Sequence, residues 1–508
     1  MSIPVSDVII SLGLISVVFA IHLAFTIDDP PTMTDEGYLW YGVLEVSRGQ
    51  VPVRDFRSYE PGRYWISLLV LKFGRGLPWI RLAASATLAF GTLALVLALR
   101  VAGQRWSVSV ATVLIVIAWS PHPHKRYEQA TFLLMAGAIT WLLADPSVSK
   151  LVVVGLVAGL VIVIGTNLGL YACSAALLSL LIVARGPELS LVRDSWWLFS
   201  GVLVGSSPLW VMFLTVRGFA RAVLQRRVID VVNRRSTNLP LPIPVPWRRT
   251  PSQISGELGT LGSLVTRGLF LMIPIAAFAA CALALVGPHR WVVEQPVAIA
   301  AAVVTLPAWH HVVSRADVNH LTHVMAVPIV GLLAAISGDP WVLFIGFGIA
   351  ASGTGLVGIP MHARVQRWRD PDGFVKRSVL GHRAFWFRSR EAQLVEAALE
   401  ARASCHPLDH MLAVPMTLWL LPLLEVRSAV FDSFCVFPAT EAMEHDMIAE
   451  IEQSKPPVAV VGLEELDGRP DLRFDRTHPL VWAHLGCHYE PIELQSPLPP
   501  GVAVLRRC

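Results

Sequence analysis

The sequence is poor in charged residues and lacks the motifs that bind nucleotides. Only 15% of its 508 residues are charged and 54% are hydrophobic, whereas a soluble domain would carry about a quarter charged residues. The net charge of +4 is small and the basic residues are spread over several loops, so the composition gives no support to nucleic-acid binding. No glycine-rich phosphate loop is present. These features predict a polytopic membrane protein with a soluble portion.

The six cysteines show no Cys-x-x-Cys spacing, which argues against a zinc ribbon. Cys173 and Cys281 fall within apolar stretches. The other four, Cys405, Cys435, Cys487 and Cys508, lie in the C-terminal region. If that region is outside the cytoplasm, one disulfide could form there, but the sequence does not tell which cysteines would pair.

Long uncharged runs divide the first 360 residues into roughly eleven expected membrane spans. The first run, residues 8–27, is long for the apolar core of a signal peptide, so we expect a retained helix. A short amphipathic helix is expected at 62–73. The later spans are expected at 82–99, 106–121, 129–144, 151–165, 168–184, 196–216, 268–287, 291–309, 321–338 and 341–359.

From residue 361 onward the composition is that of a soluble domain. Helices are expected at 392–403 and 440–454, and strands at 429–437, 458–462 and 502–506. The apolar stretch 411–424 is too short to span a bilayer, so we expect a buried strand that leads into a helix. The predicted fold is therefore mainly α and polytopic, with a transmembrane module at 1–360 and a soluble α/β domain at 361–508.

The number of spans before each polar loop decides on which face of the membrane that loop emerges. If these spans are right, the outer loops 28–78 and 217–267, the two shorter loops 120–128 and 310–320, and the C-terminal region all emerge on one face of the membrane. The opposite face receives only short links such as 145–150. An active site at the membrane surface requires this clustering of polar residues on one side.

Residues 34–65 carry five carboxylates and four arginines directly after the first apolar span. Asp35 and Glu36 are adjacent, and like charges this close raise one pKa and favour the binding of a proton or a cation. The pair could merely cap and solvate an interfacial helix, or it could be functional. The residues alone leave both interpretations open.

This loop resembles the first outer loop of the GT-C glycosyltransferases. The resemblance is carried by the acidic pair, by Gly49-x-x-Pro52-x-x-Asp55 and by Pro61-Gly62 before the next helix. It is closest to the branch of protein mannosyltransferases, aminoarabinose transferases and RgtA-like proteins, which use polyprenyl-phosphate sugars. The resemblance implies that Asp35 is the catalytic base, that Glu36 orients it or binds a cation, and that Asp55 and Arg63 support the loop.

A second cluster of ionisable residues lies at 120–128, where two prolines break the helix between spans. Ionisable residues at a membrane edge are candidates for function. Lys125 and Arg126 could bind the donor phosphate, and Glu128 could be the second acidic residue that the family often places here. The alternative is that the two cations only extend toward the membrane interface.

A third cluster, at 310–323, resembles the Arg-x-Asp-x-x-His element of bacterial relatives. The resemblance implies that Arg315 neutralises the donor phosphate as a planar, permanently charged group. Asp317 and His320 are one helical turn apart and could hold it in place. The histidines of this stretch, His310, His311, His320 and His323, have no tight ligand spacing, so no metal site is predicted.

The 217–267 loop contains two further features. Paired arginines alternate with apolar residues over 221–235, which predicts an amphipathic helix lying in the interface. The alternating prolines of 239–246 then require an extended chain. The loop could gate the lipid phosphate or the acceptor, or it could be a structural loop on the surface.

The resemblance implies a membrane glycosyltransferase that moves a sugar from a polyprenyl-phosphate donor to a lipid, glycan or protein acceptor. The expected location is the outer side of the bacterial cytoplasmic membrane, with the C-terminal domain on that side. The nine arginines of 217–267 conflict with this sidedness under the positive-inside rule. No cofactor is required, although the acidic pair could bind a divalent cation. The alternatives are a transporter or lipid flippase and a non-catalytic scaffold.

Overall fold

The computed structural model describes residues 4–31, 35–74, 76–230, 232, 239–245, 252–336, 348, 350–405 and 408–508. The chain forms two compact units. The helical unit comprises Met1–Thr26, Arg81–Met212 and Asn238–Gln366. The mixed unit comprises Ile27–Ile80, Phe213–Thr237 and Arg367–Cys508. Each unit is described by itself below.

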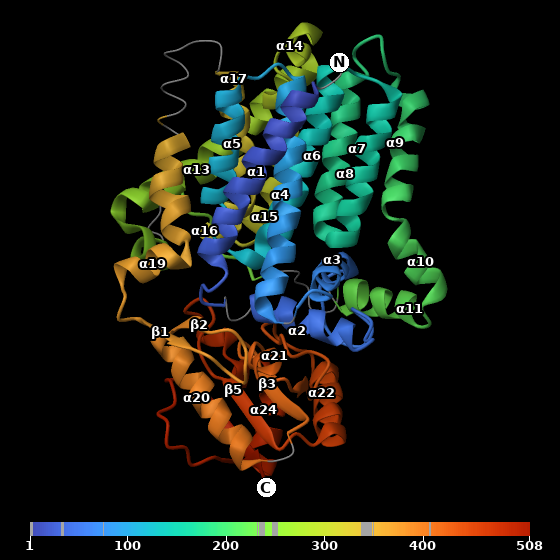
Figure 1. The fold of residues 1–508 in the computed structure, drawn as a ribbon. Coiled ribbons are helices and arrows are strands. Elements are labelled where there is room, and N and C mark those ends of the chain that lie inside the picture. Colours follow the sequence, from blue (N-terminus) through green and yellow to red (C-terminus); the bar gives the residue numbers. More distant parts are fainter. Residues whose placement is uncertain are drawn as a thin grey trace. The chain divides into compact units, whose positions relative to one another are not determined.

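The helical unit is built from the apolar runs of the sequence (Figure 1). Every span predicted before residue 337 falls on a helix or on a pair of helices, whereas the predicted 341–359 span lies largely outside the described residues. The helices are α1 (Val5–Thr26), α4 (Leu77–Val101), α5 (Trp106–Ala118), α6 (Arg126–Ala144), α7 (Val148–Ile164), α8 (Thr166–Val183), α9 (Leu191–Gly205), α10 (Ser207–Thr215), α13 (Ser252–Val286), α14 (His289–Glu294), α15 (Pro296–Ser314), α16 (Val318–Val324) and α17 (Ala326–Ala335).

Length and composition qualify five of the described helices as membrane spans. The number rises to seven if the bent pairs α9–α10 and α16–α17 each form one span. Helices α5 and α7 are apolar but shorter, so within the described residues this criterion identifies fewer than eleven spans. The predicted 291–309 span also begins late, because Gln295 and Pro296 separate α14 from α15.

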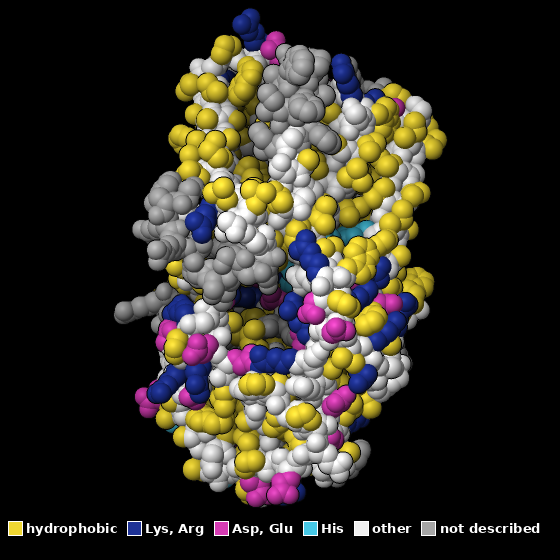
Figure 2. Space-filling model, turned by 90° about the vertical axis from the view of Figure 1, so that its left-hand side faces the viewer, with side chains coloured by type: hydrophobic (Ala, Val, Ile, Leu, Met, Phe, Trp, Pro, Cys, Tyr) yellow, Lys and Arg dark blue, Asp and Glu magenta, His cyan; other side chains and the backbone are white. Residues whose placement is uncertain are grey.

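The spans differ in how much of their surface the protein itself covers. The apolar window of α15 is 67% buried, while those of α1 and α13 are only 17% and 22% buried. Figure 2 shows hydrophobic side chains spread over much of the surface that it draws, and α1 and α13 carry exposed large hydrophobic side chains such as Val17 and Phe278. A helix that is apolar on all sides and little covered by protein has a surface suited to lipid. The helical unit therefore has the exterior of a membrane protein.

Glycines bring α7 and α9 into close contact. Gly155 and Gly159 on α7 face Gly201 and Gly205 on α9, each pair spaced by four residues. A Cβ atom on Gly159 would lie 2.3 Å from the carbonyl oxygen of Val202, and one on Gly205 would lie 2.2 Å from that of Leu156. Small residues at this spacing let two helix backbones approach closely within a membrane.

The mixed unit contains a five-stranded sheet with the order β4-β3-β5-β7-β6. β3 pairs in parallel with β4 and β5, whereas β7 pairs antiparallel with β5 and β6. The strands of this sheet are β3 (His410–Val414), β4 (Arg427–Ser428), β5 (Val458–Gly462), β6 (Tyr489–Pro491) and β7 (Val502–Arg507), and a separate hairpin joins β1 (Phe374–Arg377) to β2 (Phe385–Arg388). The principal helices are α2 (Asp35–Ser47), α3 (Pro61–Leu71), α11 (Phe219–Val223), α20 (Ser389–Ser404), α21 (Leu420–Leu423), α22 (Glu441–Ser454), α23 (Phe474–Thr477) and α24 (Pro479–His488).

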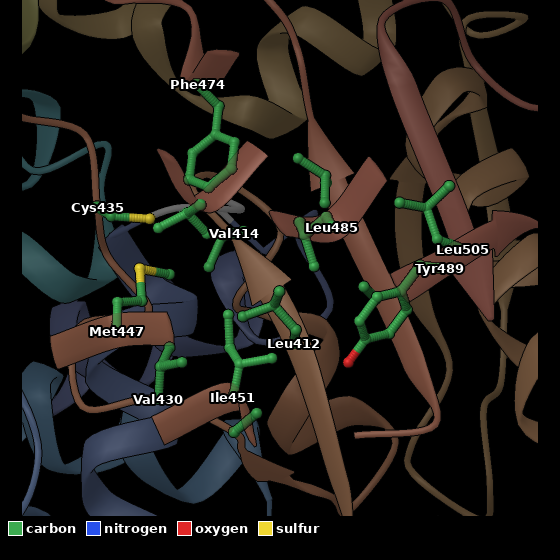
Figure 3. Close-up of a cluster of buried hydrophobic side chains, with 14 residues drawn as sticks. Leu412, Val414, Val430, Cys435, Met447, Ile451, Phe474, Leu485, Tyr489 and Leu505 are labelled. Carbon is green, nitrogen blue, oxygen red and sulfur yellow. The ribbon is translucent and has the colours of Figure 1, made fainter. Parts of the chain in front are cut away.

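Figure 3 shows the core on one face of this sheet. Leu412 and Val414 alternate along β3 and therefore point to the same face. Met447 and Ile451 from α22 and Leu485 from α24 pack against them. β3 is buried almost throughout and β5 completely, as expected for central strands covered on both faces. A C-terminal α/β fold after the helical part of the chain is thus confirmed.

The strand predicted at 429–437 is wrong. After β4 ends at Ser428 the chain continues without regular structure. The N–H group of Val430 donates to the Ser428 hydroxyl, and that of Phe431 donates to Glu450 on α22. Side chains satisfy these backbone groups, so the apolar run is buried without joining the sheet. The buried strand and helix predicted within 411–424 are present as β3 and α21.

Candidate active site

The acidic pair lies at the start of α2 in the mixed unit. Asp35 is the first residue of this helix and is partly exposed, whereas the side chain of Glu36 is only 1% exposed. The helix buries most of its length, and a Cβ atom on Gly37 would lie 2.3 Å from Cβ of Trp419. Since α2 packs inside the unit, the interpretation that the pair only caps and solvates a surface helix does not hold for Glu36.

Asp55 shapes the loop that follows α2. Its carboxylate accepts the Val51 N–H at 2.8 Å and binds the Arg54 guanidinium at 2.7 Å. Burial would raise the pKa of Asp55, but these two hydrogen bonds hold the pKa below its ordinary value. Within the mixed unit the local role of Asp55 is to close the turn 51–55.

Arg63 lies in the first turn of α3 and is 3% exposed. Its guanidinium stacks over the ring of Tyr59 at 4.3 Å. The ring of Tyr59 contacts Tyr38 on α2, with 4.8 Å between the ring centroids, and Tyr38 stacks on Phe434. Arg63 therefore belongs to an aromatic layer that binds the first loop to the C-terminal region of the same unit.

Sequence reasoning missed Arg57, which joins this layer. Arg57 Nη1 lies 2.5 Å from the carboxylate of Asp432 and donates to the carbonyl oxygen of Phe434 at 3.0 Å. The guanidinium also lies 5.3 Å from the ring centroid of Phe437. The partners are far apart in the sequence, and no local spacing indicates them.

The 120–128 cluster lies in the helical unit, where the short helix η1 (Pro123–Lys125) leads into α6. Arg126 is fully buried; its guanidinium donates to the hydroxyls of Ser85 and Thr26 and lies 3.3 Å from Nε2 of His22. These contacts tie α6 to α1 and α4. Arg126 thus has structural partners, and a role in phosphate binding stays a prediction.

Glu128 is the centre of a buried group of ionisable side chains. Its Oε2 lies 3.4 Å from Nε2 of His311 and 3.3 Å from Nδ1 of His323, and its Oε1 lies 3.5 Å from Nζ of Lys125. The two imidazoles are 3.1 Å apart. Carboxylate and imidazole at these distances can hold a divalent cation. The fold therefore gathers two of the four histidines around Glu128, which their spacing in the sequence did not indicate.

Asp317 organises the third cluster. As the N-cap of α16 it accepts hydrogen bonds from the backbone N–H and the ring Nδ1 of His320, and its other oxygen lies 3.0 Å from Nε of Arg315. Burial would raise the pKa of Asp317, but the hydrogen bonds from His320 and the charge of Arg315 lower it to about 2. Asp317 thus holds both Arg315 and His320, the geometry expected from their spacing.

The second and third clusters form one network within the helical unit. The His320 ring centroid lies 5.2 Å from that of His311 and 5.4 Å from that of His323, so the Arg315 group adjoins the Glu128 group. His122 also bonds to Asn319 at 2.9 Å. The structure thus brings together two motifs that lie almost two hundred residues apart.

Among the solved structures that match the chain, two cover nearly its whole length. The chain is similar to ArnT. It aligns with the apo form of ArnT from Cupriavidus metallidurans at 14% identity and a TM-score of 0.46, covering 98% of this chain and 97% of that chain. The structure of ArnT bound to undecaprenyl phosphate aligns with the same coverage at 14% identity and a TM-score of 0.45. At this identity the likeness concerns the fold alone. No family model and no curated protein matches the chain.

The site residues fall into two groups by unit. Asp35, Glu36, Asp55 and Arg63 belong to the mixed unit, and Lys125, Arg126, Glu128, Arg315, Asp317 and His320 belong to the helical unit. Within the mixed unit, Asp35 and Glu36 share α2, and Asp55 and Arg63 stabilise the segment that follows it. Within the helical unit, the cations Lys125 and Arg315 each lie beside a carboxylate.

Proposed function

We propose that this protein is a membrane glycosyltransferase that transfers a sugar from a polyprenyl-phosphate donor to a lipid, glycan or protein acceptor. The observation that carries the proposal is the acidic pair at the start of α2, directly after an apolar span, with Glu36 buried and the GT-C-like Gly-x-x-Pro-x-x-Asp turn closed by Asp55. A lipid-linked donor stays in the bilayer, so its chemistry takes place at the membrane surface. We place this chemistry on the outer face.

In the proposed reaction Asp35 accepts the proton of the acceptor hydroxyl. The hydroxyl oxygen attacks the anomeric carbon, the bond from that carbon to the phosphate oxygen breaks, and polyprenyl phosphate leaves with inversion at the sugar. Asp35 is the partly exposed member of the pair, as a base that meets substrate must be. Glu36 is the buried member and orients the start of the helix.

The leaving phosphate needs positive charge, which we assign to Arg315 and Lys125. Both are partly exposed, with side chains 19% and 12% accessible, and each is held by a carboxylate, Asp317 or Glu128. His320 is fixed by Asp317 and supplies a further hydrogen-bond donor. Arg126 is fully buried among hydroxyls, so we assign it a smaller contribution to phosphate binding than Arg315 and Lys125.

The position of the charges favours an enzyme over a transporter. A transporter places its ionisable residues at the middle of discontinuous membrane helices. Here Glu128 lies in the first turn of α6 and His311 in the last turn of α15. Charges at helix ends lie near the membrane surface, where a lipid headgroup is found.

The test measures transfer of radiolabelled sugar from a panel of synthetic polyprenyl-phosphate sugars into membrane extracts. We expect wild-type protein to transfer one of these sugars and Asp35→Asn to lower the rate by about 10²–10⁴-fold, the usual contribution of a general base. Asp28→Asn is the matched control, because Asp28 lies in the same loop but pairs with Arg383; its transfer rate should stay near that of wild type.

Equal transfer by wild type and Asp35→Asn, at equal protein level, would remove Asp35 as the base. If wild type transfers no sugar from any donor while it moves labelled lipid across liposome membranes, the protein is a flippase and the proposal fails.

A further inference from the structure

Three potential metal ligands meet on the mixed unit, between α22 and α24. His484 and His488 are one helical turn apart on α24, with their ring centroids 4.5 Å apart. Glu452 on α22 faces them, and its Oε1 lies 3.0 Å from Nε2 of His484. One ligand atom from each residue can be chosen so that all three lie within 4.8 Å of one another.

The contact between the two helices is fixed at both ends. Near the N-terminus of α22, Glu444 accepts the backbone N–H groups of Leu480 and Val481 at 2.7 and 3.1 Å. Near its C-terminus, Glu452 reaches His484. The two helices therefore run in the same direction, and the three ligands stand in a preformed arrangement, which reduces the entropic cost of binding an ion.

Arg507 holds the carboxylate of Glu452 in place. Its Nη2 donates to Oε1 and Oε2 of Glu452 at 3.0 and 2.8 Å. A carboxylate offers about four lone-pair sites, so Glu452 can bind Arg507 and still present Oε1 to an ion. Hydrogen bonds from outer residues commonly fix metal-binding carboxylates in this way.

His484 presents a ring nitrogen to the carboxylate of Glu452. This nitrogen, Nε2, is buried and lies 3.0 Å from Oε1 of Glu452.

We propose that Glu452, His484 and His488 form a binding site for a divalent transition-metal ion, with Zn²⁺ as the best fit. Zinc prefers imidazole and carboxylate ligands at about 2.0–2.2 Å in tetrahedral geometry, which separates two ligand atoms by about 3.3 Å. The distance of 3.0 Å between His484 and Glu452 is close to this value. Three protein ligands leave a fourth position for water.

The bound ion would connect α22 to α24 and so stabilise the C-terminal domain. This site is distinct from the Glu128 group, which belongs to the helical unit. A nearby pair on α22, Glu441 and His445, offers an internal comparison. Its two side chains are 3.7 Å apart and exposed, and they are not part of a three-ligand group in the described residues.

The test uses the full-length chain in detergent micelles, purified through a tag without histidines. Cys487 and Cys508 are exposed thiols that bind zinc themselves, so both are changed to serine in every sample. Zinc binding is measured by calorimetric titration. We expect one Zn²⁺ to be lost, or its Kd to rise at least tenfold, in His484→Ala/His488→Ala, while His445→Ala binds as before.

Two further variants control for misfolding and for zinc bound at the Glu128 group. His488 is exposed, so His488→Ala alone should fold normally and still weaken binding. Glu128→Gln should leave the C-terminal ion bound, which separates this site from the buried group. We also expect zinc to raise the unfolding temperature of the His445→Ala variant, but not that of the His484→Ala/His488→Ala variant. Equal stoichiometry and affinity in His488→Ala, in the double variant and in the control would overturn the proposal.

Discussion

Arg57 connects two segments of the mixed unit that are 375 residues apart in the sequence. It is paired with Asp432, bonded to the Phe434 carbonyl oxygen and packed on the Phe437 ring. Both side chains of the ion pair are less than a quarter exposed. Removing the carboxylate would leave a largely desolvated guanidinium with a weaker set of partners, a change that costs more than the loss of an exposed pair.

We therefore expect Asp432→Ala to destabilise the mixed unit by about 1–3 kcal/mol. The unfolding temperature in micelles should fall by about 2–6 °C. The matched control is Glu396→Ala, which breaks the exposed pair with Arg377 and should cost less than about 1 kcal/mol. Equal losses in the two variants would show that the Arg57 pair contributes no more than a surface contact.

At the scale of single residues, the sequence predicts contacts between residues that are close in the chain and misses contacts between residues that are far apart. Asp317 and His320 are one helical turn apart, so their contact follows from helix geometry alone. The Arg57 pair and the approach of Glu128 to His311 require the fold, because each joins residues from separate elements. The burial of Glu36 likewise depends on α21, far along the chain.

The α7–α9 contact shows how an element can depend on the absence of side chains. The four glycines leave no room for a Cβ atom between the two backbones. Any side chain at these positions must push the helices apart, and the neighbouring atoms are carbonyl oxygens of the backbone that cannot rotate away.

We expect Gly159→Ala to destabilise the helical unit by about 1–3 kcal/mol, the usual cost of overpacking. Gly268→Ala on α13 is the control, because no atom lies within 4 Å of the added Cβ. At this position alanine has a higher helix propensity than glycine by about 1 kcal/mol, so the stability of the protein should stay the same or rise. The two variants are compared by thermal unfolding and by gel filtration in micelles. If Gly159→Ala leaves the stability of the protein unchanged, α7 and α9 are not held at this separation.

Elements are predictable where hydrophobicity alone determines them. The apolar runs predicted α1, α4, α6 and α8 in the places where the structure has them, since a spanning helix needs only length and apolarity. The strand expected at 429–437 failed because side chains of other elements took its backbone hydrogen bonds. The β1–β2 hairpin was missed, because its strands are only four residues long each.

The orientation of the chain in the membrane is a property of the whole molecule. The proposed function requires the C-terminal domain on the outer side, although the nine arginines of 217–267 favour the cytoplasm for that loop. The charge rule applies to loops of up to about 60 residues, so it applies to this loop and opposes the proposed orientation.

Labelling with a membrane-impermeant maleimide tests the orientation. In a chain whose other cysteines are replaced by serine, exposed Cys487 should react in intact spheroplasts. A single cysteine at Asp145→Cys, where the side chain is 57% exposed in the link between α6 and α7, should react only in inverted vesicles. The opposite pattern would place the proposed chemistry on the cytoplasmic side and contradict the assignment.

The buried Arg126 has a consequence for how the chain is made. A fully buried guanidinium is costly without hydrogen-bonding partners, so α6 packs stably against its neighbours only if such partners are already present. Those partners are His22 and Thr26 on α1 and Ser85 on α4, and both helices are synthesised before α6. The order of the helices along the chain is thus also a workable order of insertion for α6, because Arg126 is made after the groups that bind it.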